Sequence, residues 1–108
     1  MAEQALSILE MVSNAGAARN AYIEAIAEVK SKNYERCNEL VAQGNELYVK
    51  AHRMHTSMLH HGSSENDLQA TLLMTHGQDV LMSAECFKIL CDEFIDLYRR
   101  IDELEKQS

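Results

Sequence analysis

The sequence contains no proline and no tryptophan, and glycine occurs only four times in 108 residues. Proline and glycine form most tight turns, and a β-sandwich or barrel needs such a turn every ~8–12 residues. No apolar run approaches the ~20 residues that cross a bilayer, and no basic N-terminal stretch precedes an apolar segment. These absences argue against an all-β fold and against membrane insertion. They predict a single helical domain over residues 1–108, soluble and cytoplasmic.

Basic residues are also scarce. Ten Lys and Arg residues stand against 17 Asp and Glu residues, which gives a net charge of −7 with His neutral. Nucleic acid would be repelled, because a polyanion binds to basic surfaces. The three cysteines, Cys37, Cys86 and Cys91, are odd in number and show no C-x-x-C spacing. We interpret them as reduced thiols that act as small core residues.

Apolar residues recur with helical period in three segments, at about residues 3–32, 34–60 and 65–105. Asn33 separates the first two segments. A C-terminal cap at Gly62 and a capping box formed by Ser64 and Asp67 separate the last two. This pattern predicts a three-helix, up-down-up bundle with a long third helix of roughly 60 Å.

The third segment has more apolar surface than one bundle needs. Its main stripe lies at intervals of three or four residues, and a second apolar edge lies beside it. We predict that the main stripe faces the core, that the surplus edge mediates self-association, and that the acidic end at residues 102–105 is a solvated helix end that frays past Ile101. The stripe consists of Leu73, Val80, Phe87, Leu90, Phe94, Leu97, Ile101 and Leu104, and the second edge of Leu68, Leu72 and Cys86.

Polar groups on the apolar track of the third segment are candidates for chemistry, because their burial is unfavourable unless they are compensated. Counting back in heptads from Leu97 places His76 on the track that we expect to face the core. Asp79 lies one turn further on, and Gly77 would leave room for a close approach to the helix. On spacing alone, His76 is either a hydrogen-bonded core residue or a site residue. An H-x-x-D pair offers too few ligands for a zinc site in one chain.

The other four histidines, His52, His55, His60 and His61, crowd the end of the second segment. They form either a surface Zn or Ni site or a set of solvated side chains near the negative end of the helix dipole. If these histidines are solvated, we expect His52 to be the one that is not, because it lies next to the small residue Ala51. Arg19 interrupts the stripe of the first segment and could reach an anion.

Three motifs follow one another along the chain. Residues 13–19 form a run of small residues that ends in Arg19, residues 50–56 contain Ala-His-x-x-x-Thr, and residues 76–83 read His-Gly-Gln-Asp-Val-Leu-Met-Ser. Their order and separation resemble the lactose/cellobiose-specific enzyme IIA components of the bacterial phosphoenolpyruvate-dependent sugar phosphotransferase system. In that family the last motif reads His-Ala-Gln-Asp-x-Leu-Met-Thr.

The resemblance implies a role for each residue of this motif. His76 would accept a phosphoryl group at Nε2 from the phosphohistidine of HPr and pass it to a cysteine of enzyme IIB. Asp79 would meet its two copies on the axis of a homotrimer around a divalent cation, usually magnesium, and Gln78 would line the site. The membrane component, enzyme IIC, would bind the sugar and would interact only indirectly. Gly77 and Val80 depart from the residues usual in the family.

These observations lead to three hypotheses. The first is a phosphocarrier for uptake of a β-linked disaccharide such as lactose, cellobiose or diacetylchitobiose, with His76 as the covalent intermediate. The alternative is a non-catalytic trimeric helical module with an interaction or regulatory role. The third is a surface metal-binding bundle that uses the histidines at the end of the second segment.

Overall fold

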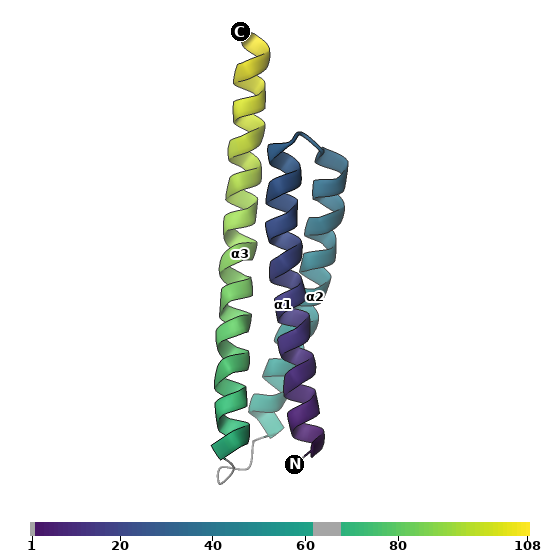
Figure 1. Cartoon of the computed structure of the whole chain (residues 1–108), viewed down its shortest axis with the longest axis vertical. Helices are drawn as coiled ribbons and strands as arrows, with labels where there is room; N and C mark the ends of the chain where they lie inside the picture. The colour runs from purple at the N-terminus through teal and green to yellow at the C-terminus, as the bar shows by residue number, and fades with distance from the viewer. Residues whose placement is uncertain (1, 62–67) are drawn as a thin grey trace.

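The computed structural model of the chain describes residues 2–61 and 68–108, and within them the chain forms three helices and no strand. Helix α1 spans Ala2–Lys30, α2 spans Tyr34–His61 and α3 spans Leu68–Gln107. The helices run up, down and up in a slender bundle (Figure 1), and the three-helix prediction is confirmed. The predicted cap and capping box at residues 62–67 lie outside the described residues.

Helix α1 is the centre of the bundle, because it packs closely along both other helices whereas α2 and α3 make few contacts with each other. Its small and medium-sized apolar residues form one continuous buried stripe. The residues of this stripe are Ile8, Met11, Ala15, Ala18, Ala21, Tyr22, Ala25 and Val29. The alanines let two neighbouring helices approach α1 at once, since ridges of small side chains leave shallow grooves.

The bundle-facing side of α3 differs from the prediction. Its buried positions carry mainly small residues, among them Ala70, Gly77, Ala84 and Cys91. A methyl group added at Gly77 would overlap the terminal methyl of Met11 on α1, so Gly77 faces the core and not a ligand. Of the larger apolar residues that we expected to face the core, Leu73, Val80 and Phe87 pack against it. The rest of the predicted stripe, from Leu90 to Leu104, is exposed, with Leu90 and Leu97 each about half exposed. Close packing against α1 favours small residues at most of the buried positions of α3, although Leu81 is buried among them.

The surplus apolar edge predicted for the last helix is therefore present, but it includes four of the eight residues of the stripe assigned to the core. Eight residues at intervals of three, four or seven share one side of α3, which at about 100° per residue confines them to a sector of roughly 60°. We call this set the exposed stripe. Its members are Leu72, His76, Asp79, Ser83, Leu90, Phe94, Leu97 and Ile101, all exposed except the half-buried Ser83.

The turn between α1 and α2 is built by backbone hydrogen bonds and one left-handed residue. Lys32 has a φ of 68°, and the N–H of Asn33 donates to the carbonyl of Glu28 at 2.9 Å, which closes the end of α1. The Asn33 carbonyl then accepts the first hydrogen bond of α2, from Cys37 N–H at 3.0 Å. Asn33 thus separates the two helices, as predicted, although α1 ends at Lys30 and not near residue 32.

The acidic end of α3 does not fray at Ile101, and the prediction of a solvated end is wrong for Asp102. Helix α3 continues to Gln107, past the level of the α1–α2 turn (Figure 1). Asp102 is only 5% exposed. Its carboxylate accepts a short hydrogen bond from the Tyr34 hydroxyl and forms ion pairs with Lys32 at 3.3 Å and Lys106 at 3.4 Å. The guanidinium of Arg99 lies 4.7 Å from the centre of the Tyr34 ring.

Replacing Asp102 by Asn is expected to lower the thermal midpoint of unfolding. The Tyr34 hydrogen bond, with the Lys32 and Lys106 hydrogen bonds, holds the pKa of this carboxyl below its ordinary value of 3.8, although burial opposes the shift. A carboxyl whose pKa is lower in the folded than in the unfolded protein stabilises the fold at pH values above its ordinary pKa. This stability is lost as the pH falls through the pKa of the folded state. The difference in thermal midpoint between wild type and Asp102→Asn should therefore be constant from pH 7 to about pH 5 and should vanish at lower pH.

Glu103→Gln is the matched control for this prediction, because it removes one charge from an exposed position in the same turn of α3. Thermal unfolding of the three proteins between pH 2 and pH 7, at one protein concentration, measures the effect. Equal midpoints for Asp102→Asn and Glu103→Gln at pH 7 would contradict the role of the buried carboxylate.

Candidate functional site

His76 lies on α3 with its side chain exposed. Successive helical residues point about 100° apart, so the core contact of its neighbour Gly77 turns His76 to the side of the bundle. His76 shares the heptad track of Leu90 and Leu97, as predicted, but this track faces outward. No hydrogen bond or ion pair joins the His76 side chain to another of the described residues. Its imidazole is therefore accessible to a partner molecule.

Asp79 lies one turn along α3 from His76 and is also exposed. Residues three apart on a helix point about 60° apart, so both side chains belong to the exposed stripe. Within the described residues no Lys, Arg or His forms an ion pair with Asp79. Gln78, the third predicted residue, is half-buried and lies about 100° around the helix from Asp79. The structure thus brings His76 and Asp79 to one face and turns Gln78 toward another.

A polar contact from α1 reaches the same face. Arg19 Nη1 donates a hydrogen bond to the Oγ of Ser83 at 3.3 Å, and Ser83 lies one helical turn beyond Asp79 on the exposed stripe. From the sequence we predicted that Arg19 could reach an anion, but we did not predict which helix it contacts. The sequence placed Ser83 on the heptad track of His76 and at the end of the motif at residues 76–83, but did not predict its contact with Arg19.

The described histidines at the end of α2 belong to no group of three possible metal ligands. Among residues 2–61 and 68–108, apart from the undescribed side chain of His61, no three His, Cys, Asp or Glu residues converge. His52 and His60 are exposed, and the ring of His52 lies 6.0 Å from that of Tyr48. We expected His52 to be less solvated than its neighbours, and this is wrong. His52 is exposed, whereas the side chain of His55 is half-buried.

His55 has a buried Nε2 atom without a hydrogen-bond partner in the described part of the chain. Burial lowers the pKa of His55, and the neighbouring charge of His52 lowers it further. A lowered pKa keeps the imidazole neutral at pH 7. His55 therefore behaves as a core histidine of α2.

The cysteines divide into two buried thiols and one exposed thiol. Cys37 and Cys91 are fully buried, as predicted, whereas Cys86 is exposed on α3, so the core assignment is wrong for Cys86. Burial, with contributions from Cys37 and Asp92, raises the pKa of Cys91 to about 11. The Cys91 thiol donates to the Tyr22 carbonyl at 3.6 Å. A thiol that stays protonated at pH 7 is a poor nucleophile, so the two buried cysteines pack and do not react.

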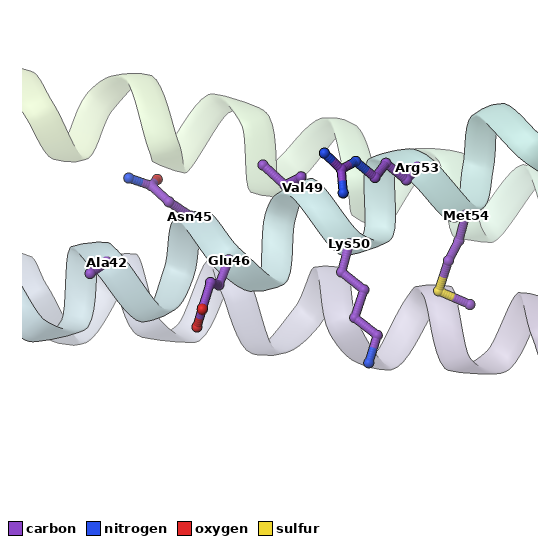
Figure 2. A pocket seen from close by; sticks show the side chains of 7 residues that line it. All are labelled: Ala42, Asn45, Glu46, Val49, Lys50, Arg53 and Met54. Carbon is purple, nitrogen blue, oxygen red and sulfur yellow. The ribbon is translucent and has the colours of Figure 1, made fainter.

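An open groove of about 550 Å³ runs along α2, and no motif in the sequence predicted it. Figure 2 shows Asn45, Val49 and Arg53 on the side toward α3, and Lys50 and Met54 on the side toward α1. All lining residues come from α2, so the groove does not include His76 or Asp79.

No helix in the described parts of the chain has an apolar stretch long enough to cross a membrane. The structure defines a three-helix bundle that presents an accessible histidine and a carboxylate on a largely apolar face of its longest helix. Bundles commonly place functional side chains on facing helices, whereas here both groups lie on one helix and face outward.

Sequence comparison identifies the family to which this bundle belongs. Residues 6–99 match the family model described as "PTS system, Lactose/Cellobiose specific IIA subunit", so the chain is a member of that family. It is 36% identical to the lactose-specific EIIA component of Streptococcus mutans, over 91% of this chain and 94% of that protein. It is 33% identical to the lactose-specific EIIA component of Staphylococcus epidermidis, over 84% and 88% of the two chains.

A third relative has another sugar in its name. The chain is 33% identical to the lichenan-specific phosphotransferase enzyme IIA component of Bacillus subtilis, over 89% of this chain and 87% of that protein. Family membership confirms the resemblance found in the motifs. It implies a phosphocarrier role in the phosphotransferase system, in contact with HPr and enzyme IIB.

Proposed function

We propose that His76 carries the phosphoryl group, which it accepts at Nε2 from the phosphohistidine of HPr and transfers to a cysteine of enzyme IIB. The transfer would drive uptake and phosphorylation of a β-linked disaccharide such as lactose, cellobiose or diacetylchitobiose, which the membrane component enzyme IIC binds. The supporting observation is the exposed imidazole of His76 within the region that matches the family. The relatives are named for both lactose and lichenan, so the choice among sugars stays open.

The chemistry needs an accessible, neutral imidazole. The Nε2 atom of a neutral imidazole carries a lone pair when the proton is on Nδ1, and this lone pair attacks phosphorus. The new Nε2–P bond forms as the N–P bond of the donor breaks, and the donor imidazole takes the electron pair. In the second transfer an S–P bond forms to the acceptor thiolate as the Nε2–P bond breaks. The transition state is loose, so correct positioning contributes most of the catalysis.

Two partners must reach His76 in turn, and the position of the residue allows both to do so. The side chain stands on the outer face of α3, and none of the described residues covers it with a hydrogen bond or ion pair. The surrounding stripe is apolar, which suits docking of a partner surface. HPr and enzyme IIB would use this face one after the other.

We further propose that three copies of the chain assemble through the part of the exposed stripe from Asp79 to Ile101, which leaves His76 at the edge of the interface, and that this assembly brings three Asp79 side chains together. One chain alone offers a single carboxylate at this position, and no three-ligand group forms within its described residues. Carboxylate oxygens are the ligands that Mg²⁺ prefers, so Asp79 fits a shared magnesium site. The cation would supply positive charge that relieves repulsion among the three carboxylates.

Phosphoryl labelling tests the proposed function. The chain is incubated with phosphoenolpyruvate, enzyme I and HPr, and the product is analysed by mass spectrometry of its peptides. We expect one phosphate on His76, labile in acid and stable in base, and its loss when enzyme IIB is added. Phosphate on another residue would overturn the assignment of His76. An intact trimer that takes no label would instead favour the non-catalytic module.

Replacing Asp79 by Leu is expected to keep or raise the stability of the trimer and to make it insensitive to chelators. The substitution removes three charges whose burial is unfavourable unless a cation compensates them. Sedimentation and thermal unfolding with and without EDTA measure the effect. Asp92→Leu is the control, because Asp92 is an exposed carboxylate on another face of α3. A sharp loss of stability in Asp79→Leu, equal with and without EDTA, would contradict the shared site.

A further inference from the structure

Arg19 is the one residue of α1 that a side-chain hydrogen bond of the described chain joins to the exposed stripe of α3. Its Nη1 atom donates to the Oγ of Ser83 at 3.3 Å, and its side chain is half-buried between the two helices. An arginine interrupts the otherwise small and apolar inward-facing residues of α1 at this point. Its partner is a neutral hydroxyl, which leaves the positive charge without compensation by that contact.

The charge of Arg19 has no carboxylate partner in the described part of the chain. The five ion pairs found there involve Lys32, Arg36, Arg100 and Lys106, and none involves Arg19. A guanidinium stays charged at all relevant pH values and has five N–H donors in a rigid plane. The hydrogen bond to Ser83 uses one of these donors and fixes the orientation of the plane. The other donors can therefore bind an anion at the surface of α3.

The position of Ser83 determines which anion lies close. Ser83 is four residues beyond Asp79, and side chains at this spacing are neighbours on a helix surface. His76 is seven residues away, a rise of roughly 10 Å along the axis. The guanidinium at Ser83 therefore lies nearer the level of Asp79 than the level of His76 along the helix axis. Asp79 and Arg19 are both without an ion-pair partner among the described residues.

We propose that Arg19, oriented by Ser83, is a positioning residue that supplies the positive charge facing the Asp79 carboxylates when copies of the chain assemble. This inference rests on the proposed trimer with its shared cation. Three carboxylates that converge repel one another, and three guanidinium groups around them reduce this repulsion. Arg19 thereby lowers the concentration of divalent cation that the assembly requires.

The test is a magnesium titration of trimer assembly. Wild type and Arg19→Gln are freed of metal with EDTA, dialysed, and analysed by sedimentation at one protein concentration with increasing Mg²⁺. We expect Arg19→Gln to need about tenfold more Mg²⁺ for half-assembly, as loss of a nearby opposite charge predicts. Arg19→Lys should lie between the two proteins, because it keeps the charge without the planar hydrogen-bonding geometry.

Arg36→Gln is the matched control, since it removes the same charge from an exposed site of α2 that is paired with Glu39 at 3.1 Å. It should assemble as the wild type does. A second comparison uses the Asp79→Leu background, where Arg19→Gln should have no further effect on assembly. An equal loss of assembly on either background, or one that Mg²⁺ does not reverse, would show that Arg19 merely packs and would overturn the proposal.

Phosphoryl labelling of the same samples separates this inference from the proposed function. A wild-type chain that takes phosphate on His76 but stays monomeric at every Mg²⁺ concentration would overturn the role of Arg19 and leave the phosphocarrier intact. A trimer that needs more Mg²⁺ without Arg19, but accepts no phosphate, would support the role of Arg19 and overturn the phosphocarrier.

Discussion

Replacing His76 by Ala is expected to abolish phosphorylation of the chain and all transfer to enzyme IIB. The phosphoryl group would be carried as a covalent bond to Nε2 of His76, and alanine has no atom that could form this bond. The fold should be unaffected, because the His76 side chain is exposed and has no hydrogen bond or ion pair to the described residues. Labelling from phosphoenolpyruvate through enzyme I and HPr, with thermal unfolding of the same sample, measures both effects.

His52→Ala is the matched control for this experiment. His52 is an exposed histidine on another helix, so its removal changes the histidine content without touching α3. We expect normal labelling from this variant. A His76→Ala protein that labels as well as the wild type, with the phosphate mapped elsewhere, would contradict the assignment.

The second large effect is expected at Gly44 on α2, where replacement by Ala should destabilise the bundle. An added methyl would lie 2.7 Å from Cε1 and 3.0 Å from Cδ1 of Tyr22. The Tyr22 ring is buried, and its hydroxyl donates to Asn45 Oδ1 at 2.7 Å, so the ring cannot move aside easily. Overpacking costs about 1–3 kcal/mol, of which better helix propensity recovers at most ~1 kcal/mol. We therefore expect a net loss of about 1–2 kcal/mol.

Gly77→Ala is the informative comparison, because its neighbour can move. The closest atom to the added methyl is the terminal methyl of Met11, the flexible end of a long side chain, and the next is Cγ2 of Val12 at 3.4 Å. Helix propensity favours Ala by roughly 1 kcal/mol, so this variant should be near neutral. Denaturant unfolding at one protein concentration measures both variants. Equal losses at Gly44 and Gly77 would contradict the difference between a rigid ring and a mobile methyl group.

The helical class and the three segments could be predicted because their signals are local. Apolar spacing placed the helices, and Asn33 marked the boundary between the first two. The side of α3 that faces the core could not be predicted in the same way. Periodicity shows that Leu90 and Leu97 share a face, but the burial of that face depends on which residues let α1 approach closely. Gly77 and Ala84 decide this point, and their small size gives them little weight in a hydrophobic pattern.

The site shows the same division between local and long-range information. His76 and Asp79 were identified from a motif, and their common face follows from a spacing of three residues. The buried carboxylate of Asp102 was missed, because its partners Tyr34 and Lys32 are about 70 residues away in sequence. The contact of Arg19 with Ser83 spans 64 residues and was missed for the same reason. The homotrimer, the magnesium ion and the cytoplasmic location stay predictions.

The central position of α1 has a consequence for hydrogen exchange. Because α2 and α3 make few contacts with each other, neither can stay folded by packing against the other once α1 has opened. Amide protons in the middle of α1, around Ala18 and Tyr22, should therefore exchange only when the whole chain unfolds. Amides near the free end of α3, beyond Lys106, should exchange through local opening. The slowest-exchanging protons of the molecule would thus report its global free energy of unfolding.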